Sequence, residues 1–110
     1  MIRDLPDGES VAAAADHLRR QGRAVALVPE STDKRSLLDS FAAALSFPAY
    51  FGHNLDALAD SLGDVHPGEP TTVVWLAGSI ERADPKLYST VRTILQQSLT
   101  GDVDVLVCHR

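Results

Sequence analysis

Apolar residues form two kinds of pattern along this chain: short continuous runs, and longer segments in which they recur at helical spacing. The continuous runs cover residues 23–28, 71–76 and 103–108. Each run is short, and Gly or Pro stands close by. This combination favours strands that are buried on both faces.

Four other segments have the spacing of amphipathic helices. Ser10 and Asn54 are good N-cap residues, and Asp84-Pro85 is a typical helix start, with Pro at the first helical position. Pro48 should stop the second helix, because the residue before a proline avoids helical backbone angles. The predicted helices run over about residues 11–21, 33–47, 55–62 and 85–100.

Apolar strands that alternate with helices are typical of a parallel sheet covered on both faces. We therefore expect an α/β fold with a three-stranded parallel sheet and about four helices. The first crossover, between residues 28 and 71, should carry two helices, and the second should carry one. The length of 110 residues fits a single domain, residues 1–110, around one core.

The charge of the chain is unevenly distributed. Residues 36–81 contain six acids and no Lys or Arg, whereas the remainder contains nine acids and ten bases. A segment of one sign suits a basic protein partner or a cation, and it argues against nucleic-acid binding. The six acids are Asp39, Asp56, Asp60, Asp64, Glu69 and Glu81.

The sequence also limits where the protein can act. No run of about 18 apolar residues is present, so we expect no membrane span. The first ten residues, MIRDLPDGES, lack the features of a signal peptide. The single cysteine, Cys108, permits no intrachain disulfide, which fits a reducing compartment. We therefore expect a cytoplasmic protein.

Few residues suggest catalysis or a cofactor. Cys108 lies in a predicted strand and is expected in the core. The four histidines are scattered, so we predict no metal site, and no Gly-rich loop follows the first two strands, so we predict no nucleotide cofactor. One enzymatic alternative stays open, in which His53 and Asp56 form a catalytic pair. The alternative that we favour is a turn histidine beside a helix start.

The third predicted helix gives the strongest indication of a function. Asp56, Asp60 and Asp64 are spaced i, i+4 and i+8, so they share one helix face if the helix continues that far. Each like-charged pair destabilises an isolated helix by about 0.2–0.5 kcal/mol. Asp56 is compensated by the helix dipole, but Asp60 is not. Because this repulsion brings no benefit within the chain, it indicates that the carboxylates contact a partner. The alternative is a solvent-exposed helix face that has no function.

The third predicted helix lies within the stretch PAYFGHNLDALADSL, residues 48–62. This stretch resembles the barstar family of intracellular ribonuclease inhibitors. The resemblance extends more weakly from Arg23 to the C-terminus, with Trp75 in the second strand. It implies a barstar-like fold, to which residues 1–22 are a helical addition. Tyr50 and Phe51 precede the helix, where an aromatic residue can either fill the core or anchor an interface.

The resemblance also implies a function without catalysis. Members of the family block the basic active-site cleft of a small secreted bacterial ribonuclease, so we expect a microbial, guanyl-specific type of enzyme as the partner. Asp60 falls on the position whose carboxylate takes the place of substrate phosphate, and Asp64 is expected at the rim. The other positions implied to contact the partner are Tyr50, Gly52, Asn54, Leu55, Asp56 and Ala59.

Several positions depart from the family pattern. Ala59 stands where the family has a tryptophan, Phe51 lacks the hydroxyl of the second aromatic residue, and His53 replaces an acid. Gln96 and Gln97 stand about where a contributing glutamate is found. These changes leave open a second possibility, an immunity or adaptor module that binds a basic partner other than a ribonuclease.

Overall fold

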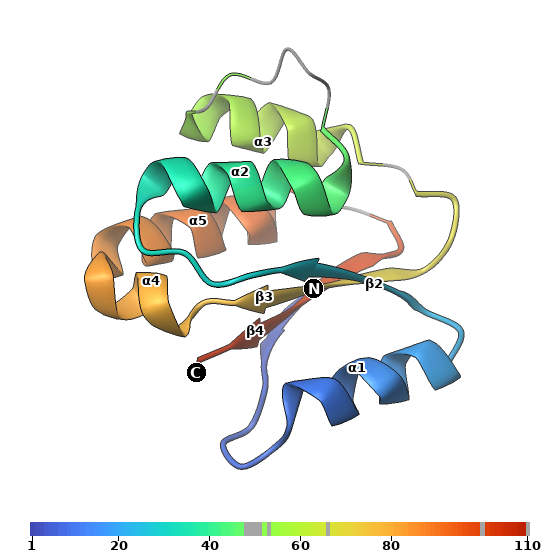
Figure 1. Cartoon of the computed structure of the whole chain (residues 1–110). Coiled ribbons are helices and arrows are strands. Elements are labelled where there is room, and N and C mark those ends of the chain that lie inside the picture. Colours follow the sequence, from blue (N-terminus) through green and yellow to red (C-terminus); the bar gives the residue numbers. More distant parts are fainter. Residues whose placement is uncertain (48–51, 53, 66, 100, 110) are drawn as a thin grey trace.

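The structure is a computed structural model that describes residues 1–47, 52, 54–65, 67–99 and 101–109 (Figure 1). Strands and helices alternate along most of the chain, as the sequence predicts. Their order is β1 (Ile2–Asp4), α1 (Val11–Arg20), β2 (Ala24–Val28), α2 (Lys34–Leu45), α3 (Leu55–Gly63), β3 (Thr71–Leu76), α4 (Gly78–Ala83), α5 (Pro85–Ser98) and β4 (Val103–Cys108).

The sheet is parallel, which confirms the predicted α/β class, but it has four strands rather than three. The strand order is β1-β4-β3-β2. The unpredicted strand, β1, pairs with β4 in the register Ile2↔Val105, and the amide of Leu5 continues the ladder by donating to the carbonyl of Val107 over 2.8 Å. The prediction missed β1 because an edge strand of three residues, Ile-Arg-Asp, does not need a continuous apolar run.

The second crossover carries two helices, α4 and α5, rather than the single helix that we predicted. Helix α4 is short, and its N-cap residue, Ala77, makes no side-chain hydrogen bond to the helix, so its sequence lacks a start signal. Other helix ends differ by a few residues. Helix α2 ends at Leu45, and the next residue, Ser46, adopts the left-handed conformation with φ of 56°. Helix α3 ends at Gly63, one residue beyond the predicted end at Leu62.

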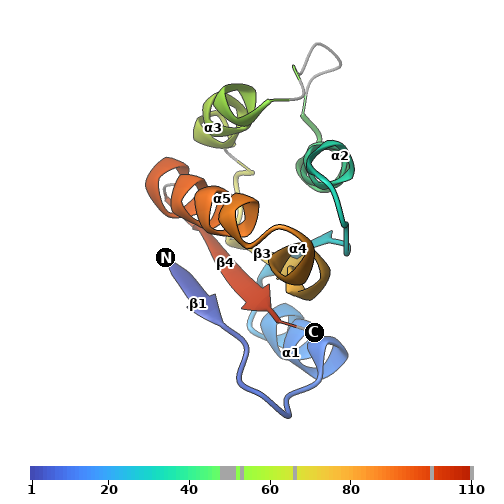
Figure 2. The same cartoon turned by 90° about the vertical axis from the view of Figure 1, so that its left-hand side faces the viewer.

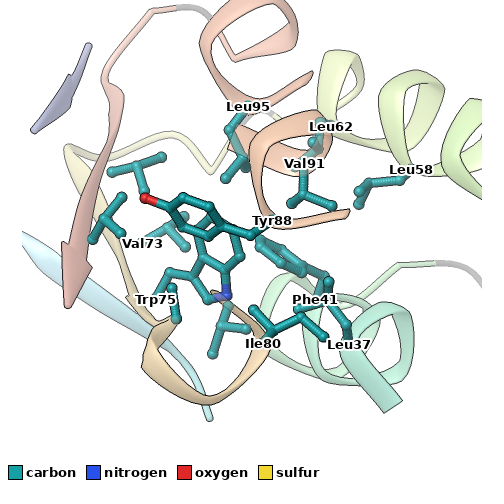
Figure 3. Close-up of a cluster of buried hydrophobic side chains, with 14 of the residues drawn as sticks. Leu37, Phe41, Leu58, Leu62, Val73, Trp75, Ile80, Tyr88, Val91 and Leu95 are labelled. Carbon is teal, nitrogen blue, oxygen red and sulfur yellow. The ribbon is translucent and has the colours of Figure 1, made fainter. Parts of the chain in front are cut away.

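Helices cover both faces of the sheet (Figure 1). Helices α2, α3, α4 and α5 lie on one face, and α1 lies alone on the other (Figure 2). The larger core lies under the four helices and centres on Trp75 (Figure 3). The ring of Trp75 contacts Phe41 edge-on at 5.7 Å between centroids and stacks on Tyr88 at 5.4 Å.

A smaller core lies between the sheet and α1. Leu18 from α1 and Leu5 from the segment after β1 pack on Val74 and Leu106 of the sheet. Cys108 is fully buried in the same cluster, which confirms its predicted place in the core. Residues before position 23 therefore contribute both an edge strand and the cover of one sheet face.

Candidate partner-binding site on helix α3

Helix α3 begins at a well-formed cap. The side-chain oxygen of Asn54 accepts a hydrogen bond of 2.8 Å from the amide of Ala57, as expected for an N-cap. The amide of Asn54 donates in turn to the carbonyl of Gly52 over 2.7 Å. A Cβ at position 52 would lie 3.4 Å from the side-chain nitrogen Nδ2 of Asn54, at the lower limit of ordinary van der Waals contact.

The inner face of α3 is anchored in the larger core. Leu58 and Leu62 are almost completely buried and lie beside Val91 and Leu95 of α5 (Figure 3). Leu55 and Ala59 are partly buried. With its leucine face fixed in the core, α3 presents its opposite face to solvent in a defined orientation.

The three aspartates lie on this outer side. Asp56, Asp60 and Asp64 are all exposed. Asp56 lies in the first turn, and Asp64 is the C-cap residue, whose amide donates to the carbonyl of Ser61 over 3.1 Å. Asp64 therefore belongs to the end of the helix.

Pairing with basic residues distinguishes the acids of residues 36–81. Asp39 lies 3.8 Å from Arg35 on α2, and Glu81 lies 2.8 Å from the ring of His109. Within the described part of the chain, no basic side chain forms an ion pair with the three aspartates of α3. Among the acids of residues 36–81, those without an ion pair to a described basic residue are therefore the three aspartates of α3 and Glu69, on the loop that precedes β3.

A pocket of about 710 Å³ lies beside α3, and Asp60, Asp64 and Gly52 all line it. Among the described residues, Asn54, Leu55, Asp56 and Ala59 are not part of its lining. The structure therefore brings three of the predicted site residues to one pocket and leaves the other four on the helix beyond it. The described lining consists of Ala26, Ala44, Leu45, Ser46, Phe47, Gly52, Ala57, Asp60, Ser61, Asp64, Val65, Pro67 and Thr71.

Three residues named from the sequence, Tyr50, Phe51 and His53, lie outside the described residues. The role of Tyr50 at an interface and the pairing of His53 with Asp56 therefore stay predictions. Gln96 and Gln97 are exposed on α5.

A second polar cluster, which sequence analysis missed, joins β1 to the rest of the fold. Arg92 of α5 donates two hydrogen bonds to Asp4, of 2.7 and 3.0 Å, and His109 lies between Asp4 at 2.7 Å and Glu81 at 2.8 Å. We call these four residues, with Tyr88, the polar clasp; the Tyr88 hydroxyl accepts a hydrogen bond from Arg92. Apart from Tyr88 and Arg92, which stand one helical turn apart on α5, its members are too far apart in sequence for any local spacing to reveal them.

Charge pairing shifts the ionisation of the polar clasp. Hydrogen bonds from Arg92 and then from His109 lower the pKa of Asp4 to about 2. The hydrogen bond to Glu81, followed by that to Asp4, raises the pKa of His109. Burial raises the pKa of the Tyr88 hydroxyl. The cluster satisfies its own charges, so it has a structural role and is a poor candidate for a ligand site.

Other kinds of site find little support in the described residues. No three of their His, Cys, Asp and Glu side chains group in a way that could hold a metal ion. None of their helices has the length and apolar character needed to cross a membrane.

Comparison with known proteins identifies a family. The family model described as "Barstar (barnase inhibitor)" matches residues 23–104. The match begins just before β2, contains all of α3 and ends within β4, so β1 and α1 lie outside it. A search of curated proteins finds no match.

Proposed function

The chain belongs to the barstar family, and on that premise we propose that it inhibits a small basic ribonuclease of the microbial, guanyl-specific type. The observation that carries the proposal is the row of exposed carboxylates on α3, a helix that is anchored in the core. No described basic side chain forms an ion pair with these carboxylates. A fixed acidic face is complementary to a cleft that is built to bind phosphate.

Inhibition follows from substitution of one anion for another. A ribonuclease cleft is lined with Arg, Lys and His, because its substrate is a polyanion. The carboxylate of Asp60 takes the place of a substrate phosphate and receives hydrogen bonds from these cations. Asp56 adds a second charge, and Gly52, Asn54 and Leu55 shape the contact, with Tyr50 beside them. The enzyme cannot bind RNA while α3 occupies the cleft.

This function requires neither catalysis nor a cofactor. The chain acts by occupying another protein's active site, inside the bacterial cell that makes the ribonuclease. In this proposal residues 1–110 form one domain, in which residues 1–22 add β1 and α1 to the family core.

Substitution of Asp60 tests the proposal. Asp60→Ala leaves several cationic groups of the enzyme buried without a counter-charge, which costs about 3 kcal/mol or more. We expect inhibition of a guanyl-specific ribonuclease to weaken at least about a hundredfold, since 1.4 kcal/mol corresponds to tenfold. The measurement is the inhibition constant at two salt concentrations, and higher salt should weaken the wild-type complex.

Asp16→Ala is the matched control, because Asp16 is an exposed aspartate on α1, on the other face of the sheet. Its inhibition constant should equal that of the wild type. Equal inhibition by Asp60→Ala and the wild type would show that Asp60 does not replace phosphate.

A second candidate function is an immunity or adaptor module for a basic protein other than a ribonuclease. The observation that favours it is Ala59, which stands on α3 where the family has a tryptophan and is only partly buried. An interface that lacks a large aromatic side chain can suit a different partner. Absence of inhibition across a panel of small microbial ribonucleases would support this candidate over the first.

A further inference from the structure

A second pocket, which we call the α1 pocket, lies between β1 and α1, on the sheet face that carries the smaller core. Its volume of about 550 Å³ lies in the range of pockets that bind small molecules. Its described lining comes from β1, the loop that follows β1, α1 and one residue of β4. All of these lining residues lie outside residues 23–104, so the match to the family model does not account for the α1 pocket.

The base of the α1 pocket is apolar. Leu5, Leu18 and Leu106 line it, and all three are buried in the smaller core. Ala13 and Ala14 line it from α1, which lies alone on this face of the sheet, and their small side chains leave space beside β1 (Figure 2). The apolar part of a ligand would therefore be removed from water here, which is favourable.

Arg3 is a cation of the α1 pocket that has no described counter-charge. Side chains of a strand point alternately to the two faces of the sheet. Ile2 packs against the larger core and Asp4 bonds to Arg92 of α5, so Arg3 points to the opposite face, where α1 lies. The strand register places it beside Leu106 of the smaller core. No described acid forms an ion pair with Arg3.

The two ends of the α1 pocket differ in charge. The chain returns through α1 to the start of β2, which is parallel to β1 in the sheet, so α1 runs antiparallel to β1. His17 lies about 10 Å along α1 from Ser10, towards the end where Arg3 lies. Glu9 lies at the other end, next to the start of the helix. The remaining acid of the described lining, Asp4, has its carboxylate in the polar clasp.

We propose that the α1 pocket binds a small molecule in which a carboxylate is joined to an apolar body. The carboxylate accepts hydrogen bonds from the guanidinium group of Arg3, and the apolar body lies on Leu5, Leu18 and Leu106. Glu9 repels a carboxylate from the opposite end, which fixes the orientation of the ligand. This binding site is independent of the inhibitor function proposed above, because it lies on the other face of the sheet from α3.

The charge of the α1 pocket favours a carboxylate over a phosphate group. A guanidinium group donates two parallel hydrogen bonds to a carboxylate, which matches it in both shape and charge. A phosphate monoester carries between one and a half and two negative charges near pH 7. Arg3 is the one Lys or Arg in the described lining, so a single negative charge is the better match.

The test uses the full chain, labelled with nitrogen-15, and two carboxylate probes that represent different sources of the same chemistry. Octanoate represents a fatty acid, and N-acetyl-leucine represents the carboxyl end of a peptide. Octanamide and N-acetyl-leucine amide are the matched neutral probes. We expect at least one carboxylate to cause saturable shifts of the amide signals of Leu5, Ala13, Ala14 and Leu18, and to bind more tightly than its neutral counterpart. The carboxylate with the higher affinity identifies the source.

Arg3→Gln tests the role of the guanidinium group. It should weaken binding of the carboxylate about two- to fivefold, as for a solvent-exposed ion pair, and leave the affinity for the neutral probe unchanged. The unchanged neutral affinity shows that the variant is folded. Arg20→Gln is the matched control, because Arg20 is an exposed arginine of α1 outside the described lining, and it should bind both probes as the wild type does.

A pair of alanine substitutions tests the location of the site. Ala13→Leu places a larger side chain in the α1 pocket and should weaken binding of both the carboxylate and its neutral counterpart about fivefold or more. Ala12→Leu makes the same change at the neighbouring exposed position, which is not part of the described lining, and should have no effect.

Three results would overturn the proposal. The first is that neither carboxylate shifts the pocket signals, and the second is that the neutral probes bind as tightly as the carboxylates. The third is that a control variant, Arg20→Gln or Ala12→Leu, weakens binding as much as the pocket variant with which it is matched.

Discussion

At the scale of single residues, Asn54 determines where α3 begins and therefore how its aspartates are placed. Its side chain caps the helix through the amide of Ala57, and its own amide is held by the carbonyl of Gly52. Neither contact involves the acids that we expect to meet the partner. The cap is thus a positioning feature of the site.

Loss of this cap should lower stability by a measurable amount. We expect Asn54→Ala to reduce the free energy of unfolding by about 1 kcal/mol, because an amide of the first turn loses its acceptor. Urea denaturation followed by circular dichroism measures this change. Asn54→Ser retains an acceptor and should lose less stability; an equal loss in both variants would show that the cap contributes little.

The sequence allowed us to predict that the aspartates of α3 are exposed, but not which of them line the pocket beside the helix. The helical spacing of the leucines places Asp56, Asp60 and Asp64 on the outer side, and the structure finds all three exposed. The pocket that distinguishes Asp60 and Asp64 from Asp56 has walls from α2, β2 and β3. No pattern within α3 could reveal walls that other elements provide.

At the scale of elements, predictability depended on the strength of the local signal. Strands β3 and β4 were predicted because burial on both faces requires continuous apolar runs. Strand β2 has such a run as well, but its predicted burial was wrong, because β2 lies at the other edge of the sheet and Leu27 is exposed. Strand β1 and helix α4 were missed because β1 is short and lies at the sheet edge, and α4 lacks a capping side chain. Elements with weak local signals form here because their neighbours stabilise them.

Removal of β1 and α1 tests how far the family core depends on them. Deletion of residues 1–22 uncovers Val74 and Leu106, and burial of one such side chain contributes about 1.5–3 kcal/mol. We expect a loss of about 3 kcal/mol or more in stability, together with binding of a dye specific for exposed apolar surface. Thermal denaturation and dye fluorescence are the measurements.

Leu18→Ala is the milder companion to the deletion, since it leaves α1 in place but removes a nearly buried side chain from the same cluster. It should cost about 2–5 kcal/mol. Full stability of the deleted chain would instead show that residues 1–22 are separate from the domain.

At the scale of the whole molecule, the polar clasp connects four distant segments. Asp4 comes from β1, Glu81 from α4, Arg92 and Tyr88 from α5, and His109 from the residue that follows β4. The contributions of Asp4 and His109 to the stability of the fold depend on pH in opposite directions. The pKa of Asp4 is lowered, so its contribution to stability is present above about pH 4 and is lost as the pH falls towards 2.

His109 behaves in the reverse sense. Because its pKa is raised in the folded state, its contribution is complete below about pH 6.5, the usual pKa of histidine, and is lost as the pH rises through the folded value. We expect the melting temperature of the wild type to fall as the pH increases above 6.5, and His109→Gln to remove most of this fall. His17→Gln, at an exposed position on α1, should leave it unchanged.

The position of β4 inside the sheet has a consequence for how the protein folds. Strand β4 lies between β1 and β3, and Ile2 pairs with Val105. Because β4 comes last in sequence among the described strands, β1 cannot join the sheet until β4 has paired with β3. Pairing over so great a sequence separation slows folding, so we expect the docking of β1 to be a late step.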